Sequence, residues 1–481
     1  MIMKALYTDA VNQEERMSEK NNSQARPFGI RDKVGYAFGD CANDFTFMLS
    51  STALLKFYTD VMNVDAWIVG TLMMLARFID AVTDVVMGQI ADRSPQRANG
   101  KFKPWIKRMA GPVCISSFLI YAVWVKDMDM GFKVFWMFFT YLLWGSVFYT
   151  SINIPYGSMA SAITDDPRQR QSLSTFRTVG SIIAAMMISV GFPLVAYYKD
   201  EAGKSVLSGT RVMYFAAVCS IIALILYMLC YHMTTERVVL KPASKKFSFR
   251  QFWSMMIHDQ ALISIILSAL LLLLAQLTQS AMSNFIYPNY FGNSSYIAVA
   301  GIVGTISTFG LAPFIGKFTA RFGRKEAALL GALLGAAAML AALLMHTHHF
   351  GIWLIFLFTS GIGMATFNLV VWAMITDVID NHEVMTGERA DGAIYSLYSF
   401  ARKLGQAASA GISGVLVSLT GYTAATAFDP AVTNGIYNIT CIVPLIGFIL
   451  LALVLKFMYP LTREKVLANT TALQNMKKEN K

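Results

Sequence analysis

The segment "RFIDAVTD", residues 77–84, contains two aspartates whose spacing suits the binding of one small cation. Asp80 and Asp84 are four residues apart, about one helical turn, so both carboxylates lie on one face of a helix. Thr83 adds a hydroxyl beside them. Carboxylate and hydroxyl oxygens are hard ligands that suit a small hard cation, and a buried carboxylate can instead carry a proton. An ion pair with Arg77 is the structural alternative, but it accounts for only one of the two carboxylates.

The sequence around these aspartates is apolar. Of the 481 residues, 55% are hydrophobic and only 14% are charged, whereas a soluble domain has about 25% charged residues. Several apolar runs reach about 20 residues, the length that crosses a bilayer. A charged side chain at the centre of such a helix costs about 2.5–3.5 kcal/mol, so Asp80 and Asp84 need a watery cavity, a partner or a ligand. The composition therefore predicts an all-α, multi-pass membrane protein.

Twelve membrane-spanning helices are predicted, and the loop after the sixth divides them into two groups of six. Of the 40 Lys and Arg residues, 30 lie on the side of the termini, in loops and tails or at the adjoining ends of spans, and five lie in the opposite loops. Cytoplasmic loops carry such an excess, so both termini are predicted to be cytoplasmic. The same bias explains the net charge of +11 without a nucleic-acid partner. The predicted spans are 35–58, 65–90, 105–125, 132–162, 172–198, 212–232, 261–287, 295–315, 326–346, 350–376, 393–421 and 434–458.

Five parts follow from this division of the chain. The linker is predicted to contain a short helix on the inner leaflet, because Phe249, Trp253 and Met256 have helical spacing near basic residues; a plain basic linker is the alternative. No cleavable signal peptide is expected. The predicted parts are a cytoplasmic tail (1–33), an N-terminal six-helix bundle (34–232), the cytoplasmic linker (233–260), a C-terminal six-helix bundle (261–458) and a cytoplasmic C-terminal tail (459–481).

Two loops in corresponding places of the halves are alike. "GQIADRSPQRANGK" (88–101) and "GKFTARFGRK" (316–325) begin with Gly and carry Arg five residues later, although Ala320 stands where the first copy has Asp92. Such an arrangement indicates parallel repeats. The pair resembles the loop signature of the major facilitator superfamily, so we expect the major facilitator fold.

Other ionisable or amide side chains also fall inside the predicted spans of both halves. Transporters built from repeats bind substrate near the midplane, between the repeats. An exporter of amphipathic compounds with the same fold is the main alternative, but it would favour an apolar pocket with few fixed charges. A membrane-embedded enzyme is disfavoured, because the sequence has no paired-His motif, Gly-rich phosphate loop or nucleophile–His pair. No cofactor is expected, and no metal beyond a coupling cation. The residues concerned are Asp44, Thr150, Asn153, Arg177 and Lys403.

The region from Lys33 to Pro460 resembles the glycoside–pentoside–hexuronide:cation symporter family. That resemblance implies uptake of a glycoside, such as a pentoside, a small oligosaccharide or a hexuronide, driven by Na⁺, Li⁺ or H⁺ through alternating access in the cell membrane. The partners would be the sugar, the monovalent cation and the lipid bilayer. The motifs that carry the resemblance are "KVGYAFGD", "FYTDV", "ARFIDAVTD", "GKFKPW", "NIPYGS", "TDVIDNHEVMTGERADG" and "ARKLGQA".

Similarity to the melibiose permease of that family assigns roles to individual positions. Asn153 stands where that permease has a second sugar-binding aspartate, and "NIPYGS" is more similar to the glucuronide and pentoside permeases. Trp372 either offers an aromatic face to a sugar ring or only packs. Asp44 would repel a sugar acid, which favours neutral glycosides. The implied cation-binding residues are Asp80, Thr83, Asp84 and Thr150. The implied substrate-binding residues are Asp44, Asn153, Arg177, Trp372 and Lys403.

Overall fold

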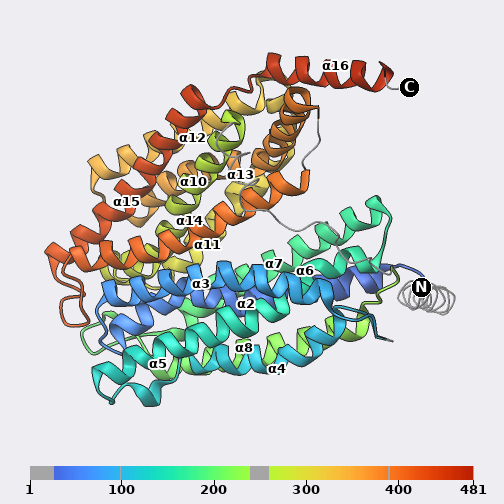
Figure 1. The fold of residues 1–481 in the computed structure, drawn as a ribbon. Helices are drawn as coiled ribbons and strands as arrows, with labels where there is room; N and C mark the ends of the chain where they lie inside the picture. Colours follow the sequence, from blue (N-terminus) through green and yellow to red (C-terminus); the bar gives the residue numbers. More distant parts are fainter. Residues whose placement is uncertain (1–25, 98, 239–258, 388–390, 480–481) are drawn as a thin grey trace. The chain divides into compact units, whose positions relative to one another are not determined.

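A computed structural model describes residues 26–97, 99–238, 259–387 and 391–479. The helix predicted at Phe249, Trp253 and Met256 therefore lies outside the described residues. Each of the twelve predicted spans coincides with helical structure (Figure 1). The helices before the linker are α2 (Ile30–Asp60), α3 (Ala66–Arg93), α4 (Lys103–Leu119), α5 (Met130–Leu142), α6 (Thr150–Ile163), α7 (Pro167–Ala196) and α8 (Gly209–Met233). Those after it are α10 (Gln260–Phe285), α11 (Tyr296–Phe322), α12 (Arg324–Met345), α13 (Phe350–Thr386), α14 (Asp391–Leu419), α15 (Pro430–Leu453) and α16 (Arg463–Glu479).

Short helical segments extend or join several of these helices. A 3₁₀ turn, η1 (Val123–Val125), follows α4. Three π-helical segments continue other spans: η2 (Leu143–Tyr149) joins α5 to α6, η3 (Ile286–Tyr290) extends α10, and η4 (Val454–Met458) extends α15. Among the described residues, nine helical stretches are long and apolar enough to cross a membrane. The three other predicted spans coincide with α2, α4 and α14.

A β-hairpin and a polar helix were not anticipated from the sequence. Strands β1 (Tyr197–Lys199) and β2 (Ser205–Leu207) form an antiparallel hairpin between α7 and α8, with Tyr198 opposite Val206. Helix α16 follows the last span; it is polar overall, which explains why a search for apolar runs assigned this region to a tail.

The chain forms two compact units. Among the described residues, the first comprises those within 26–54, 79–188 and 209–238, and the second comprises those within 55–78, 189–208 and 259–479. In the first unit, α4 packs against α6 and α8. In the second, α12 packs against α13 and α15, and α10 packs against α14 and α15. Buried aliphatic and aromatic side chains from these helices form the core of the second unit.

Close backbone approaches let the helices of the second unit pack tightly. A Cβ atom added at Gly363 of α13 would lie 2.6 Å from the carbonyl oxygen of Gly331 in α12. Small residues at helix interfaces permit such approaches in membrane proteins, where van der Waals packing supplies much of the association energy.

A buried Lys–Asp pair in the second unit joins the end of α2 to two distant segments. Lys56 is 1% exposed, and its ammonium lies 2.8 Å from a carboxylate oxygen of Asp60. The Lys56 ammonium also donates to Asn289 at 2.8 Å and to the Tyr422 hydroxyl, which in turn donates to Asp60 at 2.9 Å. The Lys56 ammonium also lies 4.7 Å from the ring centroid of Phe285. Each charge in this buried network therefore has hydrogen-bonding partners, as low-dielectric surroundings require.

The loop that follows α3 is fixed by a carboxylate from the segment after α8. Glu236 accepts hydrogen bonds from the backbone N–H groups of Lys101, Phe102 and Lys103 at 2.7–2.9 Å. These groups lie at the start of α4, where helical N–H groups lack intrahelical partners. Gly100 adopts φ +100°, and a Cβ atom there would lie 2.5 Å from the Glu236 carboxyl carbon. Burial raises the pKa of Glu236, while the three N–H groups act in the opposite direction.

Candidate functional site

Two carboxylate–hydroxyl pairs connect α3 to the η2–α6 region in the first unit. Ser146 donates a hydrogen bond to the Asp80 carboxylate, and Thr150 donates to Asp84 Oδ1 at 2.8 Å. Both carboxylates are four residues apart on α3, and both hydroxyls are four residues apart on the facing segment. The structure thus brings three of the predicted cation-binding residues together and adds Ser146, which the sequence analysis missed.

The π-helical segment η2 places these hydroxyls. Thr150 Oγ1 lies 3.1 Å from the carbonyl oxygen of Gly145, five residues earlier. A Cβ atom added at Gly145 would lie 3.2 Å from Asp80 Oδ1, so glycine leaves room for the carboxylate. π-Helical turns are rare and often occur at functional sites. Here the widened turn presents Gly145, Ser146 and Thr150 to the two aspartates of α3.

The Thr83 hydroxyl makes a hydrogen bond within its own helix. It donates to the backbone carbonyl of Asp80 at 3.1 Å, an i to i−3 bond within α3. The hydroxyl proton of Thr83 is therefore directed to the backbone of α3.

Two further side-chain contacts, each to an aspartate, connect α2 to α7. Arg177 Nε donates to Asp40 Oδ1 at 2.8 Å, and Ser181 donates to the Asp44 carboxylate. The helices meet closely at Gly180, where an added Cβ atom would lie 2.3 Å from the carbonyl oxygen of Ala37. Arg177 is thus neutralised by Asp40, and Asp44 is held by a hydroxyl that sequence reasoning did not single out.

Asn153 belongs to a short hydrogen-bonded chain of polar side chains. Asn43 Nδ2 donates to Asn153 Oδ1 at 3.2 Å, and the Tyr227 hydroxyl donates to Asn43 Oδ1 at 2.7 Å. Asn43 and Tyr227 are buried, at 1% exposure each. These hydrogen bonds orient the Asn153 side-chain amide. Its oxygen accepts from Asn43, and its nitrogen is directed away from that bond and can donate to a ligand.

The remaining predicted residues lie in the second unit. Trp372 of α13 is 47% exposed, and its ring lies 5.3 Å from that of Tyr398 of α14 in a T-shaped arrangement. The guanidinium of Arg402 lies 5.7 Å from the Trp372 ring centroid. Lys403, the next residue of α14, is half-buried. Lys403 was predicted from the sequence to bind substrate, whereas its neighbour Arg402 was not.

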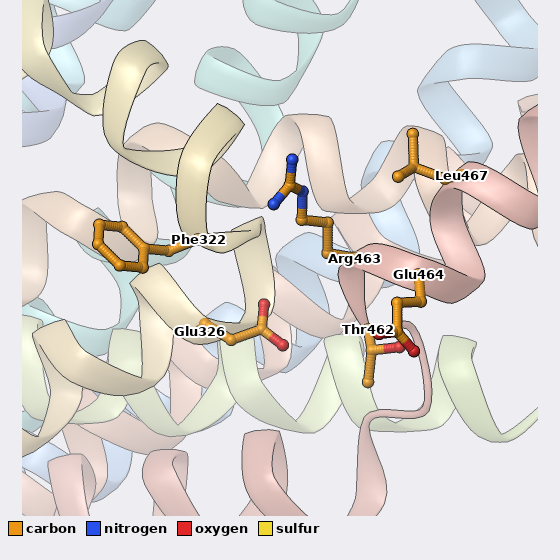
Figure 2. Close-up of a pocket in the computed structure, with 6 residues that line it drawn as sticks. All are labelled: Phe322, Glu326, Thr462, Arg463, Glu464 and Leu467. Carbon is orange, nitrogen blue, oxygen red and sulfur yellow. The ribbon is translucent and has the colours of Figure 1, made fainter.

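A separate pocket lies on the second unit, where the end of α11 and the start of α12 face α16 (Figure 2). It contains none of the predicted site residues. Arg463 at the start of α16 donates a hydrogen bond to the backbone carbonyl of Arg321 near the end of α11, at 2.8 Å. The pocket thus belongs to the second of the two similar loops and to its contact with α16. Its lining residues are Phe322, Glu326, Thr462, Arg463, Glu464 and Leu467.

The long apolar helices and the polar groups held between them define a membrane transporter of the major facilitator class. The chain belongs to the MFS/sugar transport protein family, whose model matches residues 35–463. The predicted relationship to glycoside–pentoside–hexuronide:cation symporters is confirmed. The chain is therefore a transporter and not an enzyme.

Individual relatives support this assignment. The chain is 33% identical to the glucuronide carrier protein homolog of Escherichia coli (strain K12), over 93% of this chain and 96% of the relative. It is 29% identical to the isoprimeverose transporter of Lactiplantibacillus pentosus, over 89% of this chain and 88% of the relative. The crystal structure of a D-xylose-proton symporter matches with a TM-score of 0.64 at 12% identity, covering 90% of this chain and 98% of that chain, which confirms the fold.

Proposed function

We propose that this protein couples the entry of a monovalent cation to the uptake of a glycoside. The observation that carries the proposal is the pair of rungs formed by Asp80 with Ser146 and Asp84 with Thr150. Two carboxylates and two hydroxyls supply hard oxygen ligands within a membrane protein, where unpaired carboxylates are costly. Na⁺ and Li⁺ are suited to such a set, and H⁺ can occupy a carboxylate directly.

The sugar-binding part of the proposal rests on the first unit's other polar groups. Asp44 offers carboxylate oxygens that accept hydrogen bonds from sugar hydroxyls, and Asn153 offers an amide that donates. The relatives support a glycoside as substrate, since their names include a glucuronide carrier and an isoprimeverose transporter. We also propose that Arg177, Trp372 and Lys403 contribute to the substrate site.

Membrane potential supplies part of the driving force in this proposal. A cation that moves inward gains about 2.3 kcal/mol per 100 mV of potential, and coupling transfers that energy to sugar accumulation. Alternating access would couple the two movements. We place the protein in the cell membrane with both termini cytoplasmic, on the strength of the Lys and Arg bias.

Counterflow in proteoliposomes tests the proposal. Vesicles are loaded with one of a panel of methyl glycosides, and entry of the labelled glycoside is followed with Na⁺, Li⁺ or H⁺ as the only gradient. We expect at least one glycoside to exchange, and to accumulate only when one of these cations is supplied. Exchange of no glycoside, or accumulation that ignores all three gradients, would refute the proposal.

A further inference from the structure

One face of α13 in the second unit is polar although the helix crosses the membrane. Asn368, Trp372 and Thr376 recur every four residues and are exposed. Val371 and Met374 of the same helix are buried in the core of the unit. An amide exposed to hydrocarbon has no hydrogen-bonding partner and is strongly disfavoured there. This face of α13 is therefore turned to water or to a polar ligand.

Arg402 covers the centre of this face. Its guanidinium lies 5.7 Å from the Trp372 ring centroid. Within the described ranges, Arg402 forms no ion pair and no hydrogen bond, whereas Arg177 is paired with Asp40 and Arg324 with Asp377. A guanidinium that lies over an aromatic ring keeps its edge donors free, and these match a planar oxyanion in bidentate fashion.

An amide pair lies next to Trp372 on the same face. Asn368 Nδ2 donates to Gln276 Oε1 at 3.3 Å, which connects α13 to α10. In the described part of the chain, this is the only hydrogen bond of either side chain, so Gln276 Nε2 and Asn368 Oδ1 are left as a donor and an acceptor. Neighbouring hydroxyls on a sugar ring both donate and accept, so they complement such a pair.

From these contacts we infer that the polar face formed by Gln276, Asn368, Trp372 and Arg402 is a subsite for a pyranose that carries a carboxylate. Trp372 contacts the ring, Arg402 binds the carboxylate, and the amide pair binds hydroxyls. This inference rests on the proposed function and specifies its substrate class. It opposes the sequence-based preference for neutral glycosides, which considered the charge of Asp44 and did not consider Arg402.

Arg402 is the basic side chain best placed to bind the carboxylate of the sugar. Arg177 is unsuited to the role because Asp40 already occupies its guanidinium at 2.8 Å. An alternative is that Arg402 only extends toward the inner membrane surface, as long basic side chains near helix ends do. The two roles differ in their consequences for ligand binding, since an interfacial anchor does not distinguish an acidic sugar from a neutral one.

Calorimetry on the purified full-length protein, in Na⁺, Li⁺ or acidic buffer, separates these roles. The probes are methyl β-D-glucuronide and methyl β-D-glucoside, which differ only in the carboxylate or hydroxymethyl group at C6. We expect the wild type to bind the glucuronide more tightly. Arg402→Gln should weaken glucuronide binding about 10- to 100-fold and leave glucoside binding unchanged, because a charge-assisted bond is lost.

Two further variants control this experiment. Arg402→Lys retains the charge but not the planar fork, so its loss should be smaller than that of Arg402→Gln. Arg321→Gln removes an equal charge from an exposed position at the end of α11 and should bind both probes as the wild type does. Thermal melting checks that each variant is folded. If Arg402→Gln does not fold, the comparison of Arg402→Lys with the wild type tests the subsite.

The outcomes distinguish failure of the subsite from failure of the proposed function. Equal binding of both probes by the wild type, or glucuronide binding that neither Arg402 variant weakens, would overturn the subsite while cation-coupled glycoside transport stands. If the wild type neither binds nor exchanges any glycoside in the proteoliposome panel, the proposed function itself fails.

Discussion

Ser146 in the π-helical segment η2 donates a hydrogen bond to the carboxylate of Asp80 in α3, one turn away from the equivalent bond between Thr150 and Asp84. This repetition places four oxygen-bearing side chains on two facing helical segments. A carboxylate that is held by a hydroxyl is oriented before a cation arrives, so less ordering is required on binding. The rungs therefore connect the local geometry of η2 to the proposed coupling step.

The carboxylates should be required for coupling. Asp80→Asn and Asp84→Asn should each abolish cation-driven accumulation while the protein remains folded, because the amide removes the negative charge and one acceptor. The measurement is labelled-glycoside uptake by proteoliposomes under an inward cation gradient. Asp65→Asn, an exposed position just before α3, is the matched control and should accumulate normally. Wild-type accumulation by both site variants would remove these aspartates from the cation site.

Ser146 should tune cation affinity. Ser146→Ala removes one hydroxyl from the Asp80 rung and should weaken activation by the coupling cation about 3- to 10-fold, the effect of losing a single hydrogen bond. The cation concentration for half-maximal uptake measures this change. Ser158→Ala serves as the control, since the one hydrogen bond of the Ser158 hydroxyl among the described residues is to the carbonyl of Ile154 in its own helix. A Ser146→Ala value equal to that of Ser158→Ala would show that the rung is structural.

Much of the fold was predictable, because apolar runs of bilayer length specify helices almost without regard to context. The spacing of Asp80 and Asp84 also predicted that their carboxylates share a face. Ser146 and Ser181 were not predictable in this way. Serine is common in membrane helices, and the roles of these two depend on a π-helical turn and on the close approach of α2 and α7 at Gly180.

Neighbouring positions on one helix show a second limit of sequence reasoning. Lys403 and Arg402 are adjacent, and consecutive side chains of an α-helix point about 100° apart. Only the packing of α14 on α13 shows that it is Arg402 that lies over Trp372. The polar helix α16 was missed for a related reason, since its sequence has no apolar run and its contact with α13 is a tertiary feature.

Asp44 should contribute to the affinity for the sugar and not to the affinity for the cation. Asp44→Asn should weaken glycoside binding about tenfold or more, because an asparagine side chain replaces one acceptor with a donor and loses the charge. Direct cation binding should remain close to the wild-type value, since the rungs of α3 are intact. Calorimetric titrations of sugar and of cation on the same sample measure both quantities. Unchanged sugar affinity would exclude Asp44 from the substrate site.

The buried carboxylate of Glu236 should make stability depend on pH. Its folded-state pKa is raised above the ordinary value of 4.5, so the folded protein binds the proton more tightly than the unfolded chain. Stability from this group is therefore fully present below pH 4.5 and is lost as pH rises through the raised pKa. The melting temperature of the wild type, relative to Glu236→Gln, should fall as pH increases from about 4.5 toward neutrality. Glu201→Gln, an exposed loop position, should show no such trend.

The Lys56–Asp60 pair should stabilise the second unit only while both charges are present. Asp60→Asn leaves the Lys56 ammonium buried without its carboxylate and should lower the free energy of unfolding by about 3–5 kcal/mol. The double variant Lys56→Met with Asp60→Leu removes both charges, so it should recover most of that loss, because well-packed apolar side chains often replace a buried pair at little cost. Thermal melts of the purified protein compare the three forms. If the double variant is no more stable than Asp60→Asn, an uncompensated buried charge does not explain the loss, and the hydrogen bonds that Lys56 and Asp60 make with Asn289 and Tyr422 account for it instead.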